Sequence, residues 1–442
     1  MSLSKPALAC ALAAAVLAAC AVAEQRVGLA LAVVLLLIAA GGAVGAAGRP
    51  SPLLMALAVA LAVQPMLRDA GWVVAIDLVA ALVGGAAAVA RPGRWAAVAR
   101  TLVAPFRLLA GSAAVVRALG ALRPDTREER LEPVARGVAL ALALTGVFGV
   151  LFATADSAFA DLAGNTLDLH LDSGELLWRG VLALAVLAVA GAVCRAGTAP
   201  VAGAGEQPRW LLGRTELLVA LSAVVALFAA FVAVQLRVLF GGAGYVRATT
   251  GLGYGEYARH GFVQLLLVAT LTLGVIAVAA RSRDRAVRAL LGVLCVLTLV
   301  VLASAQHRLD LVEDAYGGTR VRLAGHAIVL WTAAVFALVL AAGPWPALAR
   351  RLPQVVTALS LASVLAFSLL NPDGRIARTA VDRAATGRPI DAAYLGGLSA
   401  DALPTLRELR APEREDIVSR VRARLDSPDG LAGANLARAR AR

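Results

Sequence analysis

The stretch AGWVVAIDLVAALVGGAAAVA, residues 70–90, decides the fold class of this 442-residue chain. Its only charged side chain is Asp77. Because about 20 predominantly apolar residues in a helix span the hydrocarbon core of a bilayer, this stretch predicts a transmembrane helix.

Similar apolar stretches recur from one end of the chain to the other. The sequence is 60% hydrophobic and only 16% charged, and its mean hydropathy of +0.79 excludes a water-soluble globular protein. We predict an all-α, polytopic transmembrane helix bundle of about eleven spans. Their expected limits are 6–23, 27–46, 53–67, 70–90, 134–153, 176–194, 217–239, 262–280, 286–303, 323–342 and 355–370.

These spans suggest four regions. We expect a four-span region at 1–90, a basic amphipathic cytoplasmic segment at 91–133, a seven-span membrane domain at 134–371 and an extracytoplasmic helical tail at 372–442. In the tail, Tyr394, Leu395, Leu398, Leu403 and Leu406 follow a broadly helical spacing that predicts short amphipathic helices. The run DGLAGANLARARAR, residues 429–442, is expected to be frayed.

The positive charge of the chain predicts its orientation. The net charge is +13, and arginines gather in loops between alternate spans, as in a bacterial plasma membrane protein whose cationic loops stay in the cytoplasm. The N-terminus is then cytoplasmic and the C-terminus outside. This distribution of arginines explains the net positive charge of the chain, so we expect no nucleic-acid partner.

The arginine-rich segment after residue 90 predicts a helix in the cytoplasmic interface. Apolar residues recur at helical spacing between its arginines, and we expect a cationic face to contact anionic lipid headgroups. The contacting residues are expected to be Arg91, Arg94, Arg100 and Arg107. A plain solvated linker is the alternative, and the sequence identifies no protein partner.

Cysteines and histidines predict no metal, cofactor or disulfide. The four cysteines fall within or at the edge of apolar spans, and the acidic DLHLDSGE run, residues 168–175, has one histidine, as an ordinary hydrated loop does. The remaining histidines stand singly near predicted membrane edges, as hydrogen-bonded interfacial residues do. Residues 17–20 look like a lipoprotein cleavage box, but a second span follows at once, so we expect the first span to be retained.

Asp77 is the strongest intramembrane candidate site. A carboxylate at the bilayer centre costs about 2.5–3.5 kcal/mol on insertion scales, so it should face the bundle interior. Two interpretations of Asp77 stay open: it is part of a proton or cation relay, or it is a neutral acid hydrogen-bonded to nearby backbone.

Four polar segments flank the later spans on the predicted outer side. They are LFATADSAFADL (151–162), GYGEYARHGFVQLLLVATL (253–271), SAQHRLDLVEDAYGGTRVRL (304–323) and NPDGRIARTAVDRAATGRPIDAAYLGGLSADALPTL (371–406). Together they predict an outer polar cluster of Asp156, Tyr254, Glu256, Tyr257, Arg259, Arg308, Tyr316, Arg322, Asn371 and Asp373. The cluster forms either an outer vestibule or a structural network of ion pairs that locks the loops onto the bundle.

In order and placement these segments resemble a family of uncharacterised bacterial polytopic membrane proteins, domain-of-unknown-function family 4173, related to family 4153. The resemblance runs from about residue 134 to 406. It departs at Val312 and Gly318, where a tyrosine and a leucine would be expected. The resemblance implies a membrane fold and no particular reaction.

Functional hypotheses follow from the span count and the polar residues. The first is transport or cell-envelope assembly of a small solute or lipid-linked group; the alternative is a non-catalytic sensor or scaffold docking lipid or a partner. A membrane enzyme using Asp156 or Asp373 with Tyr257 is a third. Because no Walker loop, Gly-x-Ser-x-Gly or His-Glu-x-x-His motif is present, the sequence favours a protein that is not an enzyme.

Overall fold

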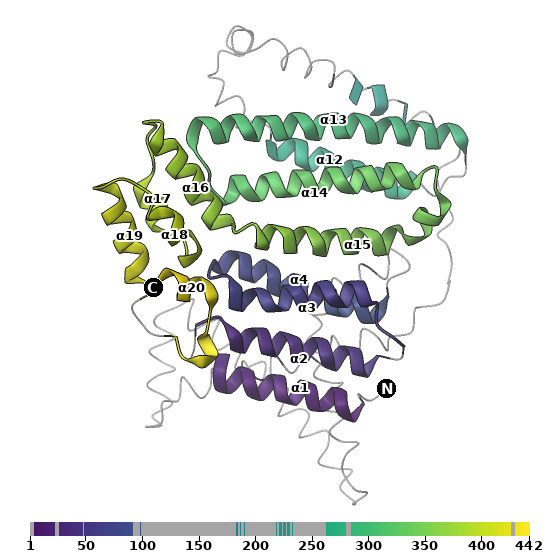
Figure 1. Ribbon diagram of the computed structural model, residues 1–442. Coiled ribbons are helices and arrows are strands. Elements are labelled where there is room, and N and C mark those ends of the chain that lie inside the picture. The colour runs from purple at the N-terminus through teal and green to yellow at the C-terminus, as the bar shows by residue number, and fades with distance from the viewer. Residues whose placement is uncertain are drawn as a thin grey trace, which may run out of the picture. The chain divides into compact units, whose positions relative to one another are not determined.

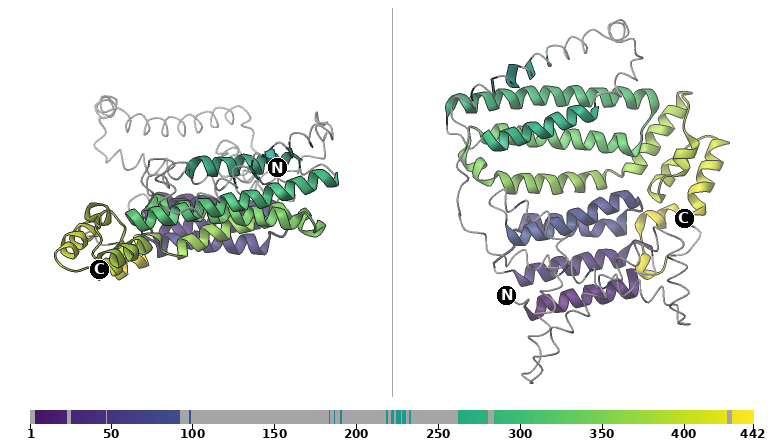
Figure 2. Two further views of the ribbon diagram at one scale, coloured as in Figure 1. Left: turned by 90° about the horizontal axis from the view of Figure 1, so that it is seen from above. Right: turned by 180° about the vertical axis from the view of Figure 1, so that it is seen from behind.

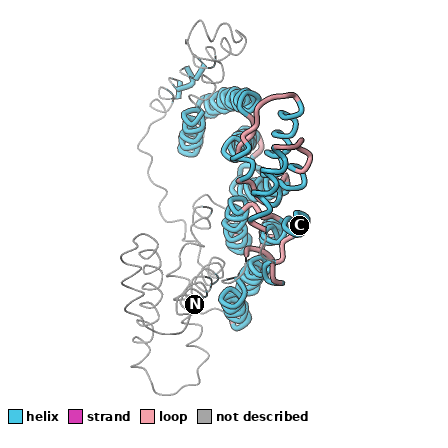
Figure 3. Tube along the Cα trace, turned by 90° about the vertical axis from the view of Figure 1, so that its left-hand side faces the viewer, coloured by secondary structure: helices cyan, strands magenta, loops and turns pink. Residues whose placement is uncertain are grey.

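The structure, a computed structural model, describes residues 4–22, 26–46, 48–91, 262–279, 284–425 and 429–442, with scattered positions between 98 and 232. Across these residues the secondary structure is helical and contains no strand (Figure 3), which confirms the predicted all-α class. Chain contacts define two compact units. The first comprises Met1–Val201, Ser399–Asp401 and Arg422–Arg442, and the second comprises Ala202–Leu398 and Ala402–Val421.

The described part of the first unit is built on the N-terminal helices (Figure 1). They are α1 (Lys5–Leu17), extended by the π-helical turn η1 (Ala18–Val22), then α2 (Leu29–Gly45), α3 (Pro52–Leu67) and α4 (Gly71–Ala90). The short helices η4 (Leu431–Gly433) and α20 (Leu436–Ala441) also belong to it. Each of α1 and α3 carries a proline in its first turn, where the missing N–H costs no hydrogen bond.

Small side chains allow these helices to pack closely. On α4 the run from Gly84 to Ala88 is buried, and the backbone N–H of Ser51 at the start of α3 donates to the carbonyl of Ala88 at 2.8 Å. Alanines of α1 likewise pack with Val34 and Ile38 of α2. Without a hydrophobic driving force between helices in lipid, such close backbone approach supplies the van der Waals contact that holds a bundle together.

The described part of the second unit contains long helices and a helical tail (Figure 2). The long helices are α12 (Phe262–Ala279), α13 (Arg285–Tyr316), α14 (Arg320–Ala342) and α15 (Pro346–Leu369). The tail helices are α16 (Pro372–Ala385), α17 (Ala392–Gly396), α18 (Leu403–Leu406) and α19 (Glu413–Ala423). η3 (Ala400–Ala402) lies at the boundary between the units. The leucines predicted to drive the tail helices, Leu395, Leu398, Leu403 and Leu406, are buried.

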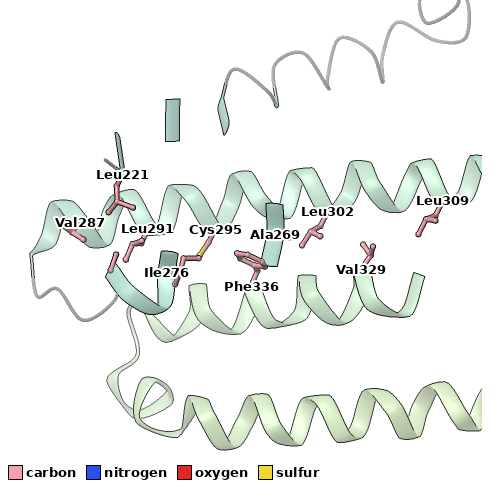
Figure 4. Packing of buried hydrophobic residues seen from close by; sticks show 11 residues of the cluster. Leu221, Ala269, Ile276, Val287, Leu291, Cys295, Leu302, Leu309, Val329 and Phe336 are labelled. Atoms are coloured by element: carbon pink, nitrogen blue, oxygen red, sulfur yellow. The ribbon is translucent and has the colours of Figure 1, made fainter. Parts of the chain in front are cut away.

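An apolar seam joins α12, α13 and α14 (Figure 4). Phe336 of α14 is fully buried and packs with Cys295 and Leu302 of α13. The seam continues along α13 from Val287 to Leu309. This packing holds α13 and α14 side by side, so that their last and first turns meet at the site described below.

One helix is much longer than the sequence predicted. The expected span 286–303 is the first part of α13, which continues to Tyr316. The polar residues between 304 and 316, expected in a loop, therefore lie on a helix. At 1.5 Å per residue a 32-residue helix is about 48 Å long, more than the roughly 30 Å hydrocarbon core. Either the helix tilts or its polar end leaves the hydrocarbon.

The helices make this chain a membrane protein. Five described helices are long and apolar enough to cross a bilayer: α1 with η1, α4, α13, α14 and α15. α2 and α3 are also apolar but shorter. The full count of about eleven stays a prediction, because the expected spans 134–153, 176–194 and 217–239, like the cytoplasmic helix, fall almost wholly outside the described residues.

Candidate functional site

In the second unit, the end of α15 turns sharply into α16 and buries a carboxylate. Asn371 makes the turn in the left-handed conformation (φ 52°) and its side-chain oxygen accepts from the N–H of Gly374 at 3.1 Å. Asparagine adopts this conformation more readily than most residues because its short polar side chain bonds locally. Pro372 begins the helix, and the next residue, Asp373, is 0% exposed.

Asp373 is neutralised by Arg320 at the start of α14. The guanidinium donates from Nε to Oδ1 at 3.0 Å and from Nη2 to Oδ2 at 2.7 Å. The backbone N–H of Arg320 donates to the hydroxyl of Tyr394 at 2.8 Å, which ties α17 to the same point. A bidentate arginine–carboxylate pair of this kind is strong and geometrically specific. It therefore fixes α14, α16 and α17 relative to each other.

A second polar cluster joins α13 to α14. The imidazole of His326, whose side chain is 12% exposed, lies between Gln306, Asp310 and Glu313 of α13. Its Nε2 is 3.0 Å from Oε2 of Glu313, and its Nδ1 is 2.6 Å from Nε2 of Gln306. His326 was expected to be an ordinary hydrogen-bonded residue near a membrane edge. It is hydrogen-bonded, and its partners come from α13 because that helix continues past residue 303.

Cationic side chains close the turn between α13 and α14. Gly317 ends α13 with φ 81°, a conformation that glycine adopts without strain. Arg383 of α16 donates from Nη1 to the carbonyl of Asp314 at 2.7 Å, and Arg322 lies 5.7 Å from the ring centre of Tyr316. The last carbonyls of α13 thus receive donors that the helix itself does not supply.

The structure therefore brings several of the predicted site residues together. Arg322, Tyr316, Asn371 and Asp373 lie at the α13–α14 and α15–α16 turns, and Arg308 lies half-buried on α13. Other predicted residues fall outside the described part of the chain: Asp156, Tyr254, Glu256, Tyr257, Arg259, Arg94, Arg100 and Arg107. Arg91 lies exposed at the end of α4, and its lipid contact stays a prediction.

The first unit contains a separate buried ionic network. Its centre is Arg438 of α20, which is 3% exposed. Nε donates to both carboxylate oxygens of Asp429 at 3.0 and 3.1 Å, and Nη1 donates to Oδ1 of Asp69 at 2.7 Å. Nη2 donates to the carbonyls of Val27 and Gly433 at 2.9 and 2.6 Å. The expectation that residues 429–442 are frayed is therefore wrong.

Residues 429–442, here called the terminal segment, also cap two helices of the first unit. The Asn435 amide donates to the carbonyls of Pro65 and Arg68 at the end of α3, at 2.9 and 2.8 Å. The carbonyl of Ala434 accepts from the N–H of Leu29 at the start of α2. Gly28 permits this approach, because a Cβ there would lie 2.5 Å from the Gly433 carbonyl oxygen. The segment thus satisfies backbone groups that the helix ends leave unpaired.

Asp401 caps α4 from a distant part of the chain. Its Oδ2 accepts from the N–H groups of Asp69 and Ala70 at 2.7 and 2.9 Å, and the N–H of Ala400 donates back to Asp69 at 3.0 Å. The N-cap residue itself, Ala70, has no side chain that can cap. Burial raises the pKa of Asp401, although the two N–H donors and Arg68 oppose that rise.

The family of the chain follows from a match that covers both polar clusters of the second unit. The family described as "Domain of unknown function (DUF4153)" matches residues 55–409. The chain belongs to the DUF4153 family. The DUF4153 match begins within α3, well before residue 134, where the resemblance in sequence started. No curated protein and no solved structure matches the chain.

The DUF4153 region includes both clusters of the second unit and, in the first, the reciprocal Asp69–Asp401 pair. The terminal segment with Arg438 lies beyond it. Sequence reasoning missed Asp69, Asp401, Asp429 and Arg438, because each appears only as a charge in a short polar stretch. One local signal was present: Asn435 precedes LARARA as an N-cap residue precedes a helix.

Asp77 is 0% exposed within α4. A hollow between α2, α3 and α4 is lined by apolar residues that do not include Asp77: Leu35, Ile38, Ala39, Ala58, Ala62, Ala81, Leu82 and Gly85. Its role as a relay stays a prediction. Among the described residues, no group of three or more His, Cys, Asp or Glu side chains is placed to hold a metal ion.

Proposed function

We propose that this DUF4153 protein moves or holds a small solute or a lipid-linked group in the bacterial plasma membrane, as a transporter or an envelope-assembly factor. The observation that carries the proposal is Asp77, an ionisable side chain buried completely within a helix long enough to span the membrane. A carboxylate in that position is costly, and such residues usually line a substrate, ion or proton pathway.

The polar ends of the helices support the same proposal. In the second unit, charged residues of both signs gather where α13, α14, α15 and α16 meet, as at the mouth of a solute site. The opposite ends of α13 and α15 carry Arg285, Arg288, Arg350 and Arg351. By the positive-inside rule the arginine-bearing ends are cytoplasmic, and the polar clusters then face outward.

The function is tested by comparing cells that lack the chain with cells complemented by the wild type or by Asp77→Asn. Soluble and lipid-linked metabolites are measured by mass spectrometry. We expect one chemical class to accumulate in the deficient cells, to return to normal with the wild type, and to remain high with Asp77→Asn, which keeps the side-chain volume but cannot ionise.

Asp382→Asn, which changes an exposed carboxylate on α16, should behave as wild type. Unchanged metabolites in the deficient cells would overturn the proposal, and equal rescue by both variants would remove Asp77 from it.

The orientation gives a separate prediction. In a variant whose four cysteines are replaced by alanine, a cysteine at the exposed position Arg388 should react with a membrane-impermeant maleimide in intact cells. A cysteine at exposed Arg350 should react only after the cells are opened. Labelling of Arg350→Cys in intact cells would contradict the proposed topology.

A further inference from the structure

The polar face of α13 is aimed at one imidazole. Gln306, Asp310 and Glu313 are spaced four and three residues apart, which places their side chains on one face of the helix. His326, in the second turn of α14, faces all three. The apolar seam below holds the two helices together, so this geometry is set by the fold.

In the structure, the hydrogen bonds of the ring fit its neutral form. Since Glu313 is an acceptor when ionised, His326 Nε2 carries a proton and donates to Oε2 at 3.0 Å. Since the Gln306 amide nitrogen is a donor, Nδ1 must offer its lone pair at 2.6 Å. The arrangement is that of neutral imidazole with its proton on Nε2.

The same surroundings can accept a second proton on Nδ1. An acceptor is already near, because Oδ1 of Asp310 lies 3.7 Å from Nδ1. Gln306 supplies another: its Oε1 is buried with no hydrogen-bond partner in the described part of the chain, and rotating the amide by 180° about its terminal bond brings Oε1 onto Nδ1. Either amide orientation leaves one of its polar groups unpaired, so Gln306 does not lock the ring in one charge state.

The charges around the ring are few. On α14 and α16, Arg322 and Arg375 act on the Glu313 carboxylate, while Arg322 is also bonded to the carbonyl of Gly317. The described sequence of α12 has no charged residue, and the only charges on α15, Arg350 and Arg351, lie near its other end. Of the two carboxylates, Glu313 bonds the imidazole directly, and Asp310 lies 3.7 Å from it.

We propose that His326 is a proton-binding site, in which the imidazole takes up a second proton on Nδ1 and is held as the cation between Glu313 and Asp310. No covalent bond between heavy atoms forms or breaks: the proton comes from water, and the ring gains one positive charge. Proton binding at His326 does not depend on the proposed function, but its role does. In a transporter, a proton bound at the outward end of α13 and α14 would couple solute movement to pH.

The test is nitrogen NMR of ¹⁵N-histidine-labelled full-length protein in lipid nanodiscs, with the His326 signals assigned by difference against His326→Gln. The ¹⁵N shifts separate the two neutral tautomers from imidazolium. We expect a single proton, on Nε2, at pH 8.5 and both nitrogens protonated at pH 5. His307, which is exposed on the same helix, is the internal control.

The carboxylates provide the second readout. In Glu313→Gln the ratio of doubly to singly protonated His326 at a fixed pH should fall about tenfold or more, the effect of losing an adjacent opposite charge. Asp310→Asn should act in the same direction. A ring that stays neutral throughout this pH range, or an unchanged ratio in both variants, would overturn the site. If His326 is protonated as expected but loss of the chain alters no metabolite, the proton-binding site stands and the transport proposal is rejected.

Discussion

The Arg438→Met variant should lose about 3–5 kcal/mol of the free energy of unfolding of the first unit, the usual cost of removing one partner from a buried ion pair. Methionine replaces much of the aliphatic volume but none of the charge. Asp69 then loses an ion-pair partner 2.7 Å away, and Asp429 keeps its ion pair with Arg442. The carbonyls of Val27 and Gly433 lose a donor as well, which adds the desolvation cost of unpaired polar groups.

Denaturant unfolding in mixed micelles measures this loss, and hydrogen exchange locates it. Exchange should accelerate at Leu29, Asp69 and Ala70, whose N–H groups depend on the terminal segment or on the residues it fixes. Arg440→Met is the matched control, because Arg440 lies exposed on the same short helix. If both variants unfold at the same denaturant concentration, the terminal segment does not stabilise the unit.

The second large effect is expected for Arg320→Met in the second unit. Asp373 is 0% exposed and loses both hydrogen bonds that neutralise it. Because the Arg320 side chain is 35% exposed, water can reach one side of the vacated pair, and we expect a loss of about 2–3 kcal/mol, less than for Arg438. Unfolding in micelles measures the loss, and exchange at the first turn of α16 should accelerate with it.

Two companion variants separate lost pairing from lost volume. Arg320→Met combined with Asp373→Leu should recover most of the stability, because an apolar pair of similar volume leaves no buried charge. Arg378→Met removes the cation of an exposed pair with Glu408 and should change stability little. A double variant no more stable than Arg320→Met would show that the lost stability does not come from the unpaired charge.

The end of α13 shows why hydropathy predicted the positions of helices better than the residues at which they end. A hydropathy window ends where polar residues begin, after residue 303. The residues that follow are still compatible with a helix, and α13 continues until Gly317 adopts a positive φ. The stop signal, Gly-Gly-Thr at 317–319, was present in the sequence. With the longer helix, Glu313 and His326 become neighbours, a pairing that charge counting between spans did not predict.

The membrane-embedded, all-helical character follows from sequence alone, because lipid cannot satisfy backbone N–H and C=O groups and an apolar chain must satisfy them within helices. Asp77 stood out for the same reason. The partners of the buried charges depended on tertiary structure: Asp401 caps a helix more than 300 residues earlier in the chain, and Arg438 enters a site formed by Val27 and Asp69. Such pairings depend on which helix ends meet in space, and a charge in a polar stretch carries no local pattern that names its partner.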